Sequence, residues 1–239
     1  MTALVDWAKD RWHRDLVSDP VIHAWALNLY RAGERYPQTV TDYFPVESAP
    51  HAALAESLRV HRQDEERHTA MYAHAIRALG QPVVDLEADD VFNVVIRSYT
   101  TESFTVAEAD DADTRRLKVA HFLAHAHTLE KRIARSLEYH LEACGSAGAP
   151  AVERIVEAVL RDERVHVRYT AESARDLLTR DEAAAVFAHH ARAETRANLA
   201  FSARQVRAFA RRFVGRSPAH HRQFYRFCGV VMEQAAEHA

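Results

Sequence analysis

The sequence predicts an all-α protein that folds as a single helical domain over residues 1–239. Glycine and proline are scarce, whereas alanine, arginine, glutamate and leucine dominate, and these residues favour helices. Apolar residues recur three and four positions apart in several long stretches, as they do on one face of a helix. No alternating strand pattern and no low-complexity segment interrupts them, and the length suits one domain with a full core.

We expect the first helix at residues 2–17 and the second from Pro20 onward. Ser18-Asp19-Pro20 is a start signal, because a capping side chain followed by proline is typical of a helix N-terminus. The second helix is apolar on nearly all sides, which indicates a central position. It reaches Glu34, and we expect Pro37 to kink it or to end it nearby.

Five further helical regions follow in the prediction, at residues 48–80, 91–144 with an interruption near 108–113, 151–178, 181–214 and from 217 onward. Ser48 is expected to cap the first of these regions, which ends near Gly80. Residues 145–150 are glycine-rich and end in proline, so they are predicted to form the clearest loop of the chain.

Composition excludes several classes of function. The net charge of −3 gives no reason to expect binding to nucleic acid or to an anionic membrane. Cys144 and Cys228 lack the spacing of a disulfide framework or a zinc-thiolate site, so we expect two reduced thiols. No apolar run approaches the length of a membrane span, and the N-terminus lacks a signal-peptide pattern. The sequence therefore predicts a cytoplasmic protein.

The motif Asp-Glu-x-x-His occurs twice, at residues 64–68 and 162–166. Its glutamate and histidine are three residues apart and share one helix face. With sixteen histidines in the chain, about one Glu-x-x-His is expected by chance, and a surface ion pair is the alternative interpretation. Both copies, however, lie within apolar stripes, which normally face a core. Buried carboxylates need a cationic partner, so this position favours a metal site.

A glutamate precedes each motif at a similar distance. Glu34 lies thirty-one residues before Glu65, and Glu130 lies thirty-three residues before Glu163. Glu130 also lies in an apolar stripe, whereas Gly33 and Pro37 flank Glu34. A two-metal site in a helix bundle requires one carboxylate from each of two further helices. The chain thus contains two similar helix pairs. In each pair, the first helix carries a glutamate and the second carries Asp-Glu-x-x-His.

This pattern resembles that of the ferritin-like di-iron carboxylate superfamily, over roughly residues 20–180. The resemblance implies a ferritin-like four-helix bundle with an additional N-terminal helix and additional C-terminal helices at about 181–237. It implies two iron ions, with manganese or a mixed Mn/Fe pair as alternatives. Asp64 and Asp162 would each accept a hydrogen bond from the ligand histidine of the opposite helix. The implied ligands are Glu34, Glu65, His68, Glu130, Glu163 and His166, with Glu65 and Glu163 bridging.

Two further residues near the motifs allow more than one interpretation. Tyr72 lies one turn after His68, an offset that resembles the radical tyrosine of the ribonucleotide reductase small subunit. A core tyrosine with a satisfied hydroxyl is the alternative. His61 lies one turn before Glu65, and some N-oxygenating members of the superfamily carry an extra histidine ligand at that offset, in the other half of the chain. His190 is expected at the surface.

The resemblance implies an O2-activating di-iron oxygenase or oxidase of the non-haem class. Its substrate would be a small or fatty organic molecule, changed by hydroxylation, N-oxygenation, desaturation or C–C cleavage. We expect a ferredoxin or reductase as electron donor, and a homodimer is compatible with the sequence. The alternative is a bacterioferritin-like or rubrerythrin-like ferroxidase or peroxide-reducing protein without an organic substrate. A non-enzymatic helical interaction protein is the third interpretation. The additional C-terminal helices favour the oxygenase.

Overall fold

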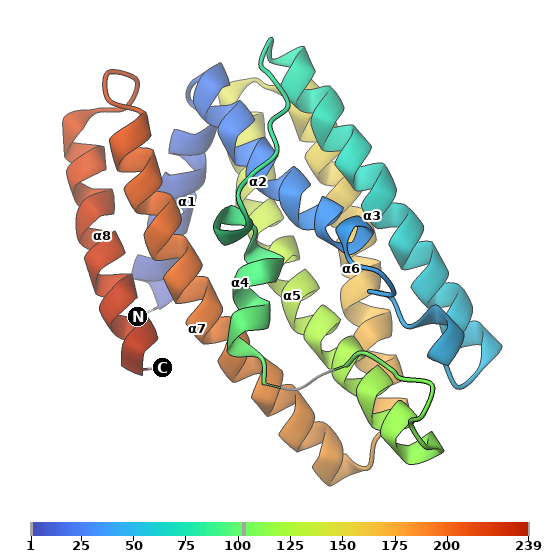
Figure 1. Cartoon of the computed structure of the whole chain (residues 1–239). Coiled ribbons are helices and arrows are strands. Elements are labelled where there is room, and N and C mark those ends of the chain that lie inside the picture. The colour runs from blue at the N-terminus through green and yellow to red at the C-terminus, as the bar shows by residue number, and fades with distance from the viewer. Residues whose placement is uncertain (1, 102–103, 239) are drawn as a thin grey trace.

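The computed structural model describes residues 2–101 and 104–238, and all of its long elements are helices (Figure 1). These are α1 (Thr2–Val17), α2 (Pro20–Thr39), α3 (Ala52–Ala78), α4 (Phe92–Tyr99), α5 (Ala112–Ala147), α6 (Pro150–Asp176), α7 (Arg180–Arg212) and α8 (Ala219–His238). Two short 3-10 helices, η1 (Val46–Ser48) and η2 (Ala88–Asp90), lie in the connections. No strand occurs in the described ranges, so the all-α prediction is confirmed for them.

Helix α2 begins where the sequence predicts. The Asp19 carboxylate accepts hydrogen bonds from the backbone N–H groups of Val21 at 2.8 Å and Ile22 at 3.3 Å. These bonds satisfy two of the amides that a helix N-terminus leaves without partners. Pro37 lies inside the last turn of α2, which ends two residues later at Thr39.

The prediction that Ser48 caps the next helix is wrong. Ser48 lies in η1, and the residue that caps α3 is His51, whose side chain accepts a hydrogen bond from the Leu54 N–H at 3.2 Å. Pro50 explains the shift, because the residue before a proline avoids helical ψ values. Ala49 accordingly has an extended backbone, with ψ at 132°, and cannot continue a helix from Ser48.

The predicted loop at residues 145–150 is also largely helical. Helix α5 continues through Gly145 to Ala147, and the turn consists of Gly148 and Ala149 alone. Gly148 has a φ of 65°, the left-handed conformation that commonly ends a helix. The break before α5 is wider than predicted, since α4 ends at Tyr99 and α5 begins at Ala112.

Two antiparallel helix pairs form the centre of the molecule, α2 with α3 and α5 with α6, and they meet where α3 packs against α6 (Figure 1). Helix α1 packs on α5, and α7 contacts both α5 and the short helix α4. Helix α8 packs on α7 and forms the outer edge of the molecule. The additional helices therefore cover one side of the two pairs.

The interior of the two pairs contains two apolar clusters. One includes Leu27, Ile76 and Val156, and the other includes Leu58 and Phe122. Along α3, α5 and α6 the residues of the two clusters are separated by the Glu and His positions of the motifs. A polar layer thus lies between two apolar layers, in the middle of the helices.

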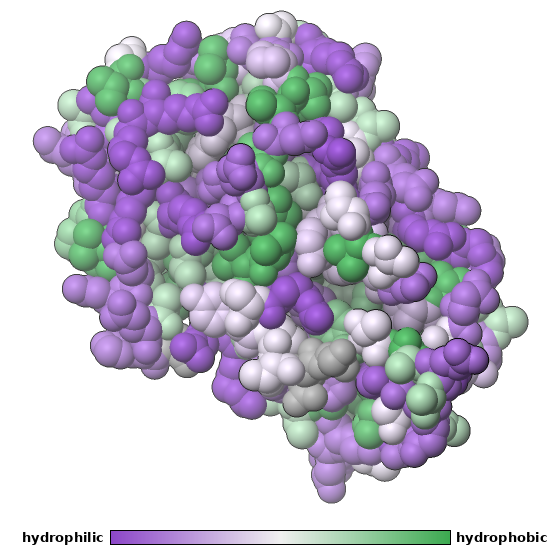
Figure 2. Space-filling view, viewed as in Figure 1, coloured by the Kyte–Doolittle hydropathy of each residue, from purple (hydrophilic) through white to green (hydrophobic). Residues whose placement is uncertain are grey.

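The face of the molecule that Figure 2 shows is largely hydrophilic. Figure 2 shows charged and polar side chains over most of the visible face, with apolar groups only in small patches. None of the described helices is both long and apolar enough to cross a membrane.

Candidate metal centre

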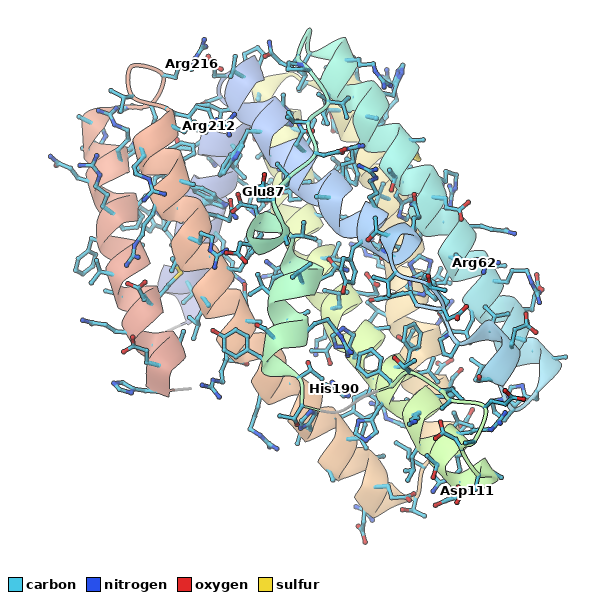
Figure 3. The ribbon with its side chains drawn as sticks, in the orientation of Figure 1. Arg62, Glu87, Asp111, His190, Arg212 and Arg216 are labelled. Carbon is cyan, nitrogen blue, oxygen red and sulfur yellow. The ribbon has the colours of Figure 1, made fainter. Side chains whose placement is uncertain are left out.

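The polar layer contains all six residues that the sequence predicts as ligands, and they come from four helices. Helix α2 contributes Glu34 and α5 contributes Glu130, while α3 and α6 each contribute one Glu-x-x-His pair. Each of the six residues is buried, with at most 5% of its surface exposed. Neighbouring residues outside the apolar stripe face solvent, as Arg62 does on the outer face of α3 (Figure 3).

Glu163 lies between the two predicted ligand histidines. One carboxylate oxygen, Oε1, is 3.2 Å from His68 Nδ1, and the other, Oε2, is 3.1 Å from His166 Nδ1. His68 Nδ1 is also 3.2 Å from Glu34 Oε2. The ligand atoms of Glu34, Glu65, His68 and Glu163 lie within 4.8 Å of one another, a spacing at which they could hold a metal ion.

His61 joins a second group of potential ligands, with Glu65 and His166. Its Nε2 atom is 3.3 Å from Glu65 Oε1 and 3.4 Å from Glu130 Oε1, and its ring stacks on that of His166 at 3.7 Å. Glu65 therefore belongs to both groups. This position is compatible with the predicted bridging role of Glu65, and it places His61 among the candidate ligands.

Asp64 and Asp162 connect α3 and α6 through the motif histidines. His68 Nε2 donates to Asp162 at 3.1 Å, and His166 Nε2 donates to Asp64 at 3.2 Å. Arg67 forms ion pairs with both aspartates. Because the Nε2 atoms carry the protons in these bonds, each aspartate holds its histidine with Nδ1 directed at the glutamates. This is the orientation that a metal-binding histidine requires.

The donor set fits a pair of divalent ions. Three buried atoms at its centre, His61 Nε2, Glu65 Oε1 and Glu163 Oε1, lack a hydrogen bond within the described part of the chain. Such atoms are rare in a protein interior unless an ion or water satisfies them. Four carboxylates supply four negative charges, which two divalent ions balance. Carboxylate and imidazole ligands suit iron and manganese.

Without such ions, the centre retains protons. Burial raises the pKa of Glu34, Glu65 and Glu130, because desolvation disfavours the charged form and the carboxylates repel one another. Burial opposes protonation of His68, yet interactions with Glu163 and Glu34 raise its pKa to about 11. Although burial lowers the pKa of His166, interactions with Asp64 and Glu163 raise this pKa to about 9. These protons compensate part of the buried negative charge.

Tyr72 is fully buried one turn beyond His68, and its ring lies 5.8 Å from that of Tyr30. Its hydroxyl has no hydrogen-bond partner among the residues described. A redox role for Tyr72 stays a prediction.

Sequence reasoning missed Tyr169, which is the hydrogen-bond partner of His61. The Tyr169 hydroxyl is 2.7 Å from His61 Nδ1, so it fixes the ring with Nε2 toward the carboxylates. Its position three residues after His166, on the same face of α6, is the signal that could have identified it.

The expectation that His190 lies at the surface is wrong. His190 is buried between α7 and α5, where its Nε2 lies 3.2 Å from His121 Nδ1 (Figure 3).

A narrow crevice reaches the centre beside His61, Glu65 and Glu130. The space between its side chains holds about one water molecule. Besides the three candidate ligands, it is lined by Gly33, Pro37, Tyr43, Phe44, Asn93, Phe122, Ala126, Leu129 and Ile133. Its wall is mostly apolar and aromatic, and the connection between α2 and α3 and the short helix α4 contribute to it.

The chain matches no protein-family model, and no curated protein or solved structure is significantly similar to it. The assignment of this centre therefore rests on the residues, their burial and their distances. The described residues show buried Glu and His groups that could hold metal ions.

We predict that the purified protein binds about two iron or manganese ions per chain, and that His68→Ala or His166→Ala lowers this number. Either substitution removes one imidazole from the buried donor set. Elemental analysis after loading and desalting measures the ratio. His74→Ala is the matched control, because His74 is exposed on the same helix. Unchanged loading in folded His68 and His166 variants would remove both residues from the site.

We predict that Asp64→Asn and Asp162→Asn each weaken metal binding by about 10–100-fold, since each aspartate orients a ligand histidine from outside the centre. Competition with a chelator of known affinity measures the change. Asp176→Asn, at an exposed position of α6, is the control. Equal affinities in all four proteins would show that the two aspartates have no role in binding.

The stability of the metal-free protein should fall as the pH rises from about 6 to about 10. His68 and His166 have raised pKa values, so their contribution is present below about pH 6.5 and is lost through about 9 to 11. The pKa values of Glu65 and Glu130 are also raised, so their contribution to stability is likewise lost as the pH rises. In the metal-loaded protein, the melting temperature should fall less over this pH range. A metal-free melting temperature that rises over this range contradicts the prediction.

Proposed function

We propose that the protein is an O2-activating di-iron or Mn/Fe oxidoreductase, built on a ferritin-like four-helix bundle formed by α2, α3, α5 and α6. The observation that carries this proposal is the buried set of four carboxylates and three histidines from four helices. Two groups of donor atoms share Glu65. Glu130 lies outside both groups and contacts His61 at 3.4 Å. When bound, the metal pair would supply the electrons for the reduction of O2.

The protein's own residues would orient the reactants and exclude water. The aspartates fix the two motif histidines, and Tyr169 fixes His61. The crevice places a mostly apolar wall next to Glu65 and Glu130, where a nonpolar molecule such as O2 is favoured over water. Asn93 is a polar side chain in this wall that could orient a substrate group.

We favour oxidation of a small or fatty organic substrate because of the way the crevice is built. Tyr43 and Phe44 belong to the connection between α2 and α3, and Asn93 belongs to α4, so three of the lining residues lie outside the four ligand helices. A protein that only oxidises iron does not require an aromatic wall at this position. A ferredoxin or reductase would deliver the electrons, and a homodimer is part of the proposal.

One observation supports the alternative. The crevice holds about one water molecule, so an organic substrate would require the aromatic wall to move. A ferroxidase or peroxide-reducing protein would not require this movement, since Fe²⁺, O2 and hydrogen peroxide are small.

The reaction of the reduced, iron-loaded protein with O2 tests the proposal. We expect rapid oxidation with uptake of about one O2 per pair of iron ions, measured by stopped-flow absorption and an oxygen electrode. His68→Ala should abolish the rapid phase, and His74→Ala should retain it. Iron that accumulates to many ions per chain would favour storage. A reaction with hydrogen peroxide but not with O2 would contradict the oxygenase.

A further inference from the structure

A second group of metal-ligating side chains lies away from the centre described above. It consists of His23 on α2 and of His140 and Cys144 on α5, and all three are buried, with at most 2% of their surface exposed. His140 lies ten residues beyond Glu130 on α5. At about 1.5 Å per residue the two groups are therefore roughly 15 Å apart. The sequence analysis did not identify this group, because 117 residues separate His23 from His140.

We propose that His23, His140 and Cys144 bind one soft monovalent metal ion, Cu(I). This inference is independent of the oxidoreductase function proposed above. His23 Nε2 and His140 Nε2 face each other at 3.0 Å, and Cys144 Sγ lies 3.9 Å from His23 Nε2. The three potential ligand atoms all lie within 4.8 Å of one another.

These separations are close to those around a bound ion. With bonds of about 2.0 Å to imidazole nitrogen and about 2.3 Å to sulfur, tetrahedral to trigonal angles place two nitrogens roughly 3.3–3.5 Å apart. A nitrogen and a sulfur lie roughly 3.5–3.7 Å apart in the same geometry. The His23–His140 and His23–Cys144 separations therefore differ from those around a bound ion by only a few tenths of an ångström.

The surrounding residues are compatible with the required form of His140. Its Nδ1 atom is 3.3 Å from His13 Nδ1, and His13 Nε2 is in turn 3.5 Å from the Ser136 hydroxyl. Tyr30 also approaches His140 Nδ1, at 3.2 Å. If His140 Nδ1–H donates to His13, and His13 Nε2–H donates to Ser136, the ring protons of His140 and His13 both have acceptors. His140 Nε2 is then left with a free lone pair directed at His23.

The charge of the site selects the ion. No carboxylate belongs to this group in the part of the chain that the structure describes. Burial also disfavours a charged imidazole, so both histidines are neutral ligands. One thiolate and Cu(I) form a neutral unit, whereas Zn²⁺ with the same ligands leaves one positive charge buried in apolar surroundings. Thiolate and imidazole ligands together suit Cu(I).

Anaerobic titration of the full-length, iron-loaded protein with Cu(I), against a colorimetric Cu(I) chelator, tests the proposal. We expect the protein to withhold about one Cu(I) per chain from the chelator. Cys144→Ser and His23→Gln should each weaken binding at least tenfold, because each removes one of three ligands. Cys228→Ser is the matched control, since Cys228 is the other thiol of the chain and lies outside the group.

X-ray absorption at the copper edge of the loaded wild-type protein gives a readout that needs no variant. We expect one sulfur and two nitrogen neighbours around the ion. Copper surrounded by nitrogen and oxygen alone, equal affinity in a folded Cys144→Ser variant, or displacement of Cu(I) by stoichiometric Zn²⁺ would each overturn the proposal.

Discussion

The burial of four carboxylates in one layer of the molecule is the constraint on which the rest of the structure depends. Bulk water cannot solvate Glu34, Glu65, Glu130 and Glu163 where they lie, and like charges at this spacing repel one another. The interior tolerates them only with compensating positive charge, from protons or from metal ions. The raised pKa values of three of these glutamates and of the two motif histidines show the first solution. The geometry of the donor atoms is compatible with the second.

This constraint accounts for the layers above and below the centre. The apolar clusters on either side pack the four helices tightly and fix the position of each glutamate along its helix. The cross-helix bonds from His68 to Asp162 and from His166 to Asp64 then fix α3 against α6 at the same height. Packing therefore sets the position of each donor atom along its helix. The two aspartates set the direction in which the donor nitrogens of His68 and His166 point.

Local chemistry explains which parts of the fold the sequence could predict. The start of α2 and the burial of the motif glutamates follow from residues within a few positions of each other, such as Asp19 with Pro20, or Glu65 with His68. The helix start assigned to Ser48 is wrong because Pro50 holds the backbone of Ala49 in an extended conformation. The loop predicted at 145–150 failed because α5 tolerates Gly145 and ends only at Gly148.

Features that depend on residues far apart in the chain could not be predicted from the sequence. Tyr43, Phe44 and Asn93 line the crevice only because the α2–α3 connection and α4 pack over Glu130, and no local pattern indicates this. These residues lie outside the helices that carry the donor atoms, so they can vary without disturbing the charge balance of the centre. In the proposed function, the choice of substrate would therefore be a property of this cover, whereas the groups that could hold metal ions belong to the four helices beneath it.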